Sequence, residues 1–335
     1  MRTRLLIAAL VVPLLAAPAV AAPPPPLPLA TASKALMFAY SALPFSEAAG
    51  PGRAFLGAGD IRIMRTDATD DRAVTTGPAT EFEPAFSPDG KLIAFSSDRA
   101  DTSAGRTDIW VVRRDGTGLR RVTTGLNARG PAWSPDGKRI AAGTDSGIAT
   151  FPATAKQPAT GKRKQVIHVT RNTPEHRDFA PVWNSDGSHL VFTRTTLANG
   201  ATTEQSLWYA PAGGSSATRL LGSTAPPGYL SQPDIAPDGK LLTFLQADSS
   251  GTAIWLADLT GTVIRRVAYS ATGGYLNTPT FSPDGRWVLF THSGLDGRSP
   301  SSIRLVSLDG TKTKVIARIK QGNYYAPSWD PTSKQ

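Results

Sequence analysis

Apolar and polar positions alternate along this chain in short runs, without the spacing of an amphipathic helix. The run 92–95 and, after Asp108, the run 109–112 are apolar, β-branched or aromatic, and polar residues flank them, as is typical of strands. A Pro-x-aromatic segment at 84–86 precedes the first run, and Asp115-Gly116 and a further run at 119–123 follow the second. The pattern therefore predicts a unit of four short strands in about 47 residues.

A Ser-Pro-Asp-Gly turn, whole or degraded, marks every unit. Its copies lie at 87–90, 134–137, 184–187, 236–239 and 282–285, and a partial sixth begins at Asp330. Measured from the second residue of each copy, the intervals are 47, 50, 52, 46 and 48 residues. A period of this length is typical of repeat architectures, and four strands in each unit indicate the blade of a β-propeller.

The two ends of the chain form complementary partial units. Segments 37–41, 60–63 and 72–75 resemble the second, third and fourth strands of a blade, whereas 326–329 resembles the first. Five internal units and one composite unit predict an all-β, six-bladed β-propeller of four-stranded antiparallel blades. Pairing of N- and C-terminal strands in the composite blade closes the ring and leaves no open end.

Aromatic residues recur at fixed places in the units. One position, just before each turn, is occupied by Phe86, Trp133, Trp183, Ile235, Phe281 and Trp329. We interpret these side chains as packing between blades and not as ligand platforms, because aromatic residues bury the largest area per side chain.

The 335 residues would suit two domains by length, but the repeat favours one large β-domain. Arg2 and Arg4, an apolar stretch over 5–15 and the small-x-small site at 19–21 predict a secretory signal peptide over 1–21, with a mature start near Ala22. The alternative, an uncleaved anchor, is disfavoured because the apolar run is short for a membrane span. We assign 22–33 to a Pro-rich linker and 34–335 to the propeller, and expect a periplasmic or secreted protein.

Composition narrows the classes of partner. The absence of Cys excludes a lipoprotein anchor, a disulfide framework and thiol chemistry. The formal net charge is +10, and its one dense cluster, 162–164, lies in an insertion over 151–165. This cluster is either a solvated loop or a contact for an acidic envelope surface. Nucleic acid is a poor partner for an exported protein, no other run has transmembrane length, and we expect a monomer.

The repeated Pro-x-[Phe/Trp]-Ser-Pro-Asp-Gly-[Lys/Arg] pattern, with its Asp-Ile-Trp and Asp-Gly segments, resembles the WD-like repeat of the TolB propeller family over 34–335. The resemblance implies six blades, a bacterial envelope setting and, by analogy, docking of a lipoprotein on the propeller face. Because about a dozen residues separate the signal from the first strand, we expect a stand-alone propeller without the additional TolB domain. Related repeats also precede peptidase domains, but we expect no such domain after this propeller.

Signatures of catalysis and metal binding are sparse. The sequence has no Gly-x-Ser-x-Gly elbow and no His-Glu-x-x-His motif. Pectin-degrading lyases with similar repeats hold a metal with several channel histidines, whereas His176 is alone at this level, so we interpret it as a salt-bridged loop residue. His292 is expected to follow a strand. Residues 67–71 resemble a calcium loop but lack its Gly and Glu, so we predict a turn. We therefore predict no catalytic residue, no metal and no cofactor, although the sequence leaves open whether the protein is an enzyme.

Loops that precede each innermost strand should surround the mouth of the central channel. They contain four of the seven tyrosines together with charged and amide residues, a composition typical of recognition surfaces. In the alternative interpretation the tyrosines merely cap the channel. The candidate binding residues are Glu81, Glu83, Arg129, His176, Arg177, Asp178, Tyr229, Tyr275, Asn277, Tyr324 and Tyr325.

These observations predict an exported, non-catalytic binding propeller of the bacterial cell envelope that docks a protein or peptide at the channel mouth. A carbohydrate-binding protein or polysaccharide lyase is the alternative, with Arg129 or Arg177 binding the carboxylates of an acidic glycan. A purely structural ring without a ligand is the third hypothesis.

Overall fold

A computed structural model describes residues 35–43, 59–103, 105–154, 158–160, 166–294, 301–319 and 323–333. The predicted signal peptide, the Pro-rich linker and the basic cluster 162–164 lie outside the described residues. Within the described part the chain forms six four-stranded sheets and no helix, and therefore no helix that could cross a membrane. The predicted all-β class and the number of blades are confirmed.

Each sheet is one blade, with strands that pair antiparallel in chain order. Blades 1 to 3, from the inner to the outer strand, are β4 (Glu81–Phe86), β5 (Leu92–Ser97), β6 (Asp108–Arg113) and β7 (Arg120–Arg121); β8 (Arg129–Trp133), β9 (Arg139–Thr144), β10 (Gly147–Pro152) and β11 (Ile167–His168); and β12 (His176–Trp183), β13 (His189–Ala198), β14 (Ala201–Pro211) and β15 (Thr218–Arg219). Blades 4 to 6 are β16 (Tyr229–Ile235), β17 (Leu241–Asp248), β18 (Gly251–Asp258) and β19 (Val263–Ala271); β20 (Gly274–Phe281), β21 (Trp287–Gly294), β22 (Ser301–Ser307) and β23 (Thr313–Ile319); and β24 (Asn323–Trp329), β1 (Met37–Leu43), β2 (Asp60–Arg65) and β3 (Arg72–Ala73).

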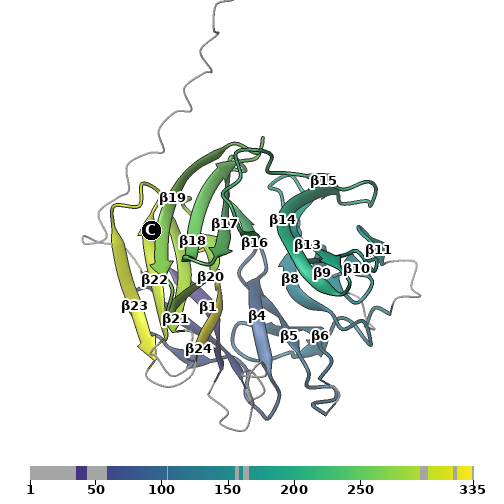
Figure 1. Ribbon diagram of the computed structural model, residues 1–335. Coiled ribbons are helices and arrows are strands. Elements are labelled where there is room, and N and C mark those ends of the chain that lie inside the picture. The colour runs from purple at the N-terminus through teal and green to yellow at the C-terminus, as the bar shows by residue number, and fades with distance from the viewer. Residues whose placement is uncertain are drawn as a thin grey trace, which may run out of the picture.

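The blades follow one another around a common centre, as Figure 1 shows. The inner strands of neighbouring blades contact each other all the way round, and the last contact, between β24 and β4, closes the circle. In the composite blade β24 pairs antiparallel with β1, with Phe38 opposite Trp329. The closure predicted from the two ends of the chain is thus confirmed.

The Ser-Pro-Asp-Gly turns satisfy their own polar groups. Ser87 Oγ accepts a hydrogen bond from Leu92 N (3.0 Å) and donates one to Asp89 Oδ1 (2.7 Å). Gly90 has φ 68°, in the left-handed region that glycine adopts without strain, and a Cβ there would lie 2.6 Å from Asp330 Oδ1 of the neighbouring blade. The glycine therefore provides both the backbone conformation and the close approach of adjacent turns.

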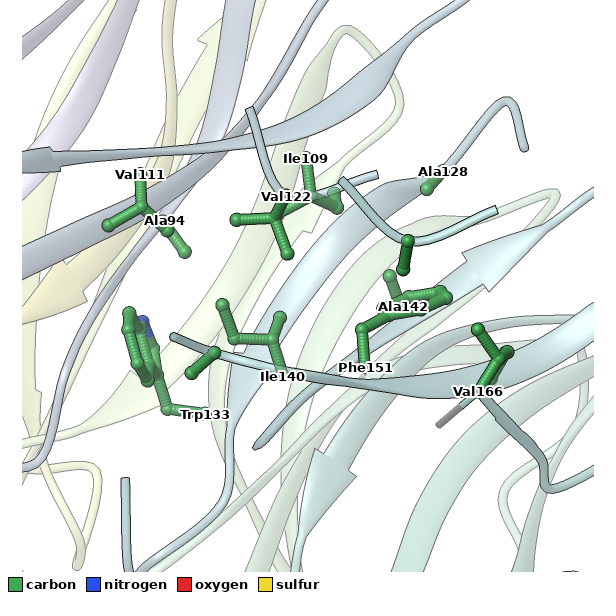
Figure 2. Packing of buried hydrophobic residues seen from close by; sticks show 13 residues of the cluster. Ala94, Ile109, Val111, Val122, Ala128, Trp133, Ile140, Ala142, Phe151 and Val166 are labelled. Carbon is green, nitrogen blue, oxygen red and sulfur yellow. The ribbon is translucent and has the colours of Figure 1, made fainter. Parts of the chain in front are cut away.

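The hydrophobic core is divided among the gaps between blades. Figure 2 shows one such cluster, in which Ile109 and Val122 of blade 1 face Ile140 and Phe151 of blade 2. The repeated aromatic position lies in these gaps, and Trp133 Nε1 donates to the carbonyl of Ala85 in the preceding blade (3.0 Å). Trp183 and Trp329 make the same type of bond to their preceding blades. The interpretation of these residues as inter-blade packing is confirmed.

Candidate functional site

All six inner strands contain a β-bulge at the same level. The bulged residue has positive φ and directly precedes a proline; the six are Glu83 (55°), Gly130 (64°), Ala180 (50°), Gln232 (53°), Thr278 (46°) and Ala326 (48°). The register of pairing with the second strand shifts at this point in every blade. Left-handed backbone is unfavourable for residues other than glycine by about 1–2 kcal/mol, so the ring maintains this strain five times over.

The bulge divides the side chains near the mouth into buried and accessible levels. The residue two positions before each bulge is buried; these are Glu81, Ala128, Asp178, Leu230, Leu276 and Tyr324. The residues one and three positions before the bulge retain solvent exposure wherever their side chains are described. This is the alternation of a strand with one face in the core and the other at the channel.

Two rings of accessible side chains result. We call the residues three positions before the bulge the outer mouth ring: Thr80, Asn127, Arg177, Tyr229 and Tyr275. We call those one position before it the inner mouth ring: Phe82, Arg129, Phe179, Ser231, Asn277 and Tyr325. Six of the eleven predicted binding residues belong to these rings, and Glu83 lies at the bulge itself.

Three of the predicted binding residues are buried beneath the mouth surface, where they contact other side chains of the blades. Asp178 forms a two-pronged ion pair with Arg194, in which Nε and Nη2 each lie 2.7 Å from a carboxylate oxygen. Glu81 pairs with Arg99 and accepts a hydrogen bond from Thr75. Tyr324 packs edge-on against Tyr40, with ring centroids 5.2 Å apart. These side chains support the mouth from inside the core.

His176 is fixed within its own loop. Its Nδ1 lies 3.1 Å from Thr173 Oγ1, and its Nε2 lies 3.0 Å from the carbonyl of Arg171. It forms no ion pair with a described carboxylate, so the predicted salt bridge is wrong: two hydrogen bonds restrain the ring instead. The stretch 67–71 is a turn as predicted, because Asp67 Oδ1 accepts from the backbone and hydroxyl of Thr69. No group of three or more potential metal ligands comes together in the described part of the chain.

At the bulge level, two side chains bridge to the next blade. Glu83 Oε2 accepts hydrogen bonds from Gly130 N (2.7 Å) and Ser96 Oγ (3.2 Å). Gln232 Oε1 accepts from Thr278 N (2.7 Å). Both bonds connect one bulge to the backbone of the following one, so they determine how far apart neighbouring inner strands lie at the mouth.

Burial perturbs the ionisable groups of the inner strands. Although Glu83 and Tyr325 keep some contact with solvent, desolvation by the surrounding strands raises the pKa of both. For Glu83 the hydrogen bond from Gly130 N and the charge of Arg129 oppose this rise in pKa. The pKa of Tyr325 is raised further by Glu83. Deeper in the ring, Asp234 accepts a hydrogen bond from Phe281 N (2.8 Å), and burial raises its pKa to about 6. The channel wall therefore disfavours negative charge at these positions.

The mouth itself is aromatic and positively charged. Phe82 and Phe179 join Tyr229, Tyr275 and Tyr325 in the two rings. Arg129 and Arg177 are exposed, and neither has a carboxylate within ion-pairing distance among the described residues. Phe82, Phe179 and Gln232 lie in the loops that counting back from each proline assigns to the mouth, but they are not among the candidate binding residues predicted from sequence.

One contact between a serine and a histidine has the residue types of a nucleophile and its base. Ser270 Oγ lies 3.1 Å from His292 Nε2, and His292 Nδ1 lies 3.4 Å from Arg304 Nη2. Because a guanidinium only donates, Nδ1 must accept and Nε2 must carry the proton. The histidine therefore donates to the serine and does not act as its base. His292 lies within β21 and does not follow a strand, which corrects its predicted position.

Neither a protein-family model nor a curated protein matches the sequence. Solved structures do resemble the model. TolB from Acinetobacter baumannii superposes with a TM-score of 0.67 at 20% identity, over 89% of this chain and 67% of the other. This chain folds as a TolB-like propeller. A protein assigned as TolB from Agrobacterium tumefaciens gives a TM-score of 0.58 at 19% identity, over 87% and 91% of the two chains.

The same architecture occurs in an enzyme. Oligogalacturonate lyase from Vibrio parahaemolyticus gives a TM-score of 0.51 at 14% identity, covering 86% of this chain and 75% of the other. At these identities the similarities establish the TolB-like propeller fold. Function must be argued from the mouth and its residues.

Proposed function

We propose that this TolB-like propeller is an exported, non-catalytic binding protein of the bacterial cell envelope that docks a protein or peptide on the two mouth rings. One observation carries the proposal: five aromatic side chains and two arginines without a described carboxylate partner gather at the mouth. Aromatic and arginine residues dominate binding energy at protein interfaces. The proposed location in the envelope rests on the signal peptide predicted over residues 1–21.

The proposal is tested by crosslinking the mature protein to native envelope proteins. The double variant Tyr229→Ala/Tyr275→Ala removes two side chains of the outer mouth ring. Tyr269→Ala is the matched control, because Tyr269 is 47% exposed on β19, outside both mouth rings, whereas Tyr229 is 42% exposed within the outer ring. Tyr324 is unsuitable for this purpose because it is buried.

We expect a partner to be retained by the unmodified protein and by Tyr269→Ala but lost from the double variant. Identical capture by all three proteins would place the binding surface elsewhere and contradict docking at the mouth. Circular dichroism of the variants would check that the ring remains folded.

A second candidate is a carbohydrate-binding protein or lyase for acidic glycans. The positive charge of Arg129 and Arg177 beside aromatic rings favours it, as does the fold shared with an oligogalacturonate lyase. Incubation with oligogalacturonates distinguishes binding from cleavage, since a lyase produces an unsaturated sugar that absorbs ultraviolet light. An absorbance increase that Arg177→Gln abolishes would replace the docking proposal with catalysis.

A further inference from the structure

Three arginines in other blades are paired with carboxylates. Arg62 Nε lies 3.0 Å from Asp71 Oδ1 in blade 6, Arg121 pairs with Asp108 in blade 1, and Arg194 pairs with Asp178 in blade 3. Arg304 of blade 5 occupies the same place in its third strand as Arg62 does in blade 6. Neither Arg304 nor the neighbouring Arg318 has a carboxylate within ion-pairing distance among the residues that the structure describes.

These two arginines lie side by side. Arg318 is directly opposite Ser302 in the pairing of β22 with β23, and Arg304 Nε donates to Ser302 Oγ (2.9 Å). Burial and the positive charge of Arg318 both lower the pKa of Arg304. Two like charges near each other, one of them partly buried, raise the energy of the folded state unless an anion accompanies them.

The adjacent polar groups are oriented as donors. Arg304 requires His292 Nδ1 to accept, so His292 Nε2–H donates to Ser270 Oγ. The hydroxyl hydrogen of Ser270 is then available to a further acceptor. Gly274 leaves room for this contact, since a Cβ there would lie 2.8 Å from His292 Nε2 and would also collide with Ser270 Oγ.

We propose that Ser270, Arg304 and Arg318 form a binding site for an oxyanion, a phosphate or a carboxylate group, at the mouth end of the gap between blades 4 and 5. An oxyanion would accept hydrogen bonds from both guanidinium groups and from the serine, and such charge-assisted bonds are the strong ones. The site shares no residue with the two mouth rings, so it is independent of the proposed docking function.

The test measures thermal stability and calorimetric binding with two probes, inorganic phosphate and galacturonate, at constant ionic strength. Arg318→Gln removes the exposed cation of the site. Arg265→Gln is the matched control, because Arg265 is also an exposed cation and lies on β19 outside the cluster. We expect saturating ligand to raise the Tm of the wild type and of Arg265→Gln by a few degrees, and binding to Arg318→Gln to be roughly tenfold weaker or more.

The melting temperatures of the same proteins without added anion provide a second readout. Since the two arginines repel each other, Arg318→Gln should then melt at the wild-type temperature or above it. A preference for phosphate or for galacturonate identifies the group that the site accepts. Equal shifts in all three proteins would reveal a general salt effect and overturn the proposal, as would no binding of either probe to the wild type.

Discussion

The two ends of the inner strands contrast sharply. At the turn end, the same four-residue motif recurs and uses its polar groups internally: Ser134 Oγ accepts from Arg139 N and donates to Asp136 Oδ1, as Ser87 does for its own turn. At the mouth end, the corresponding positions differ from blade to blade, from Phe82 to Arg129 to Ser231. Repetition at one end and variation at the other are thus properties of the same six strands.

The contrast distinguishes the repeated turn residues, which stabilise the ring, from the variable mouth residues, which are available to bind a partner. Polar groups that are satisfied inside a turn have little left for a ligand, so the repeated motif is structural. The mouth retains partly or fully exposed aromatic and cationic side chains above a buried layer that contains Asp178, Glu81 and Tyr324. Specificity is therefore expected at the mouth, and each prediction below tests this division.

Removing β24, the strand that closes the ring, should lower the free energy of unfolding more than any other change. The turn end and the mouth end of the ring both depend on this closure. Deleting residues 323–335 removes β24, whose Trp329 and Tyr324 are buried against β1. We expect a loss of more than about 5 kcal/mol in the free energy of unfolding, measured in urea. Deleting only 334–335 is the control. A truncated protein with the wild-type midpoint would disprove closure by this strand.

Breaking a buried ion pair beneath the mouth should destabilise the protein far more than breaking an ion pair at the surface. Asp178→Asn leaves Arg194, whose side chain is 13% exposed, without its counter-charge and should destabilise the protein by about 3–5 kcal/mol. Glu204→Gln breaks the exposed pair with Arg219 and should lower stability by less than about 1 kcal/mol. Equal losses in urea unfolding would remove the distinction between the two layers.

Asp234 should make stability dependent on pH. Its pKa is about 6 in the folded ring against an ordinary 3.8, so the folded protein binds this proton more tightly than the unfolded chain does. The resulting stabilisation is complete below about pH 4 and is lost as pH rises through 6, by at most about 3 kcal/mol. Asp234→Asn should lack this component, so the stability of wild type relative to variant should fall over that range. Parallel pH profiles would contradict it.

Replacing glycines at the turn end by alanine should cause smaller losses of stability, which differ with the space around each glycine. Gly137 has φ 70°, and a Cβ there would lie 3.8 Å from Pro88, so Gly137→Ala should cost only the backbone strain, about 1–2 kcal/mol. Gly90→Ala adds a close contact with Asp330 and should lose about 1 kcal/mol more. Chemical denaturation measures the difference, and the reverse order would show that adjacent turns do not pack as described.

The site was less accessible to sequence reasoning than the fold. Counting back from each proline found the strands at the mouth but not the alternation within them, and Tyr324 was therefore grouped with Tyr325 although only one of them is buried. The bulges explain the difficulty. A residue before proline ordinarily favours extended backbone, yet Glu83 and Gln232 adopt positive φ, which reorients the strand around them.

Sequence alone determined the six blades, the composite closure and the inter-blade role of the tryptophans, because each follows from a local pattern repeated at a constant interval. Only the tertiary structure decided which mouth residues are exposed, which acids are paired and which cations lack a described partner. These properties depend on contacts between neighbouring blades, such as Glu83 with Gly130 and Arg304 with His292, and residues in different blades have no local signal that relates them.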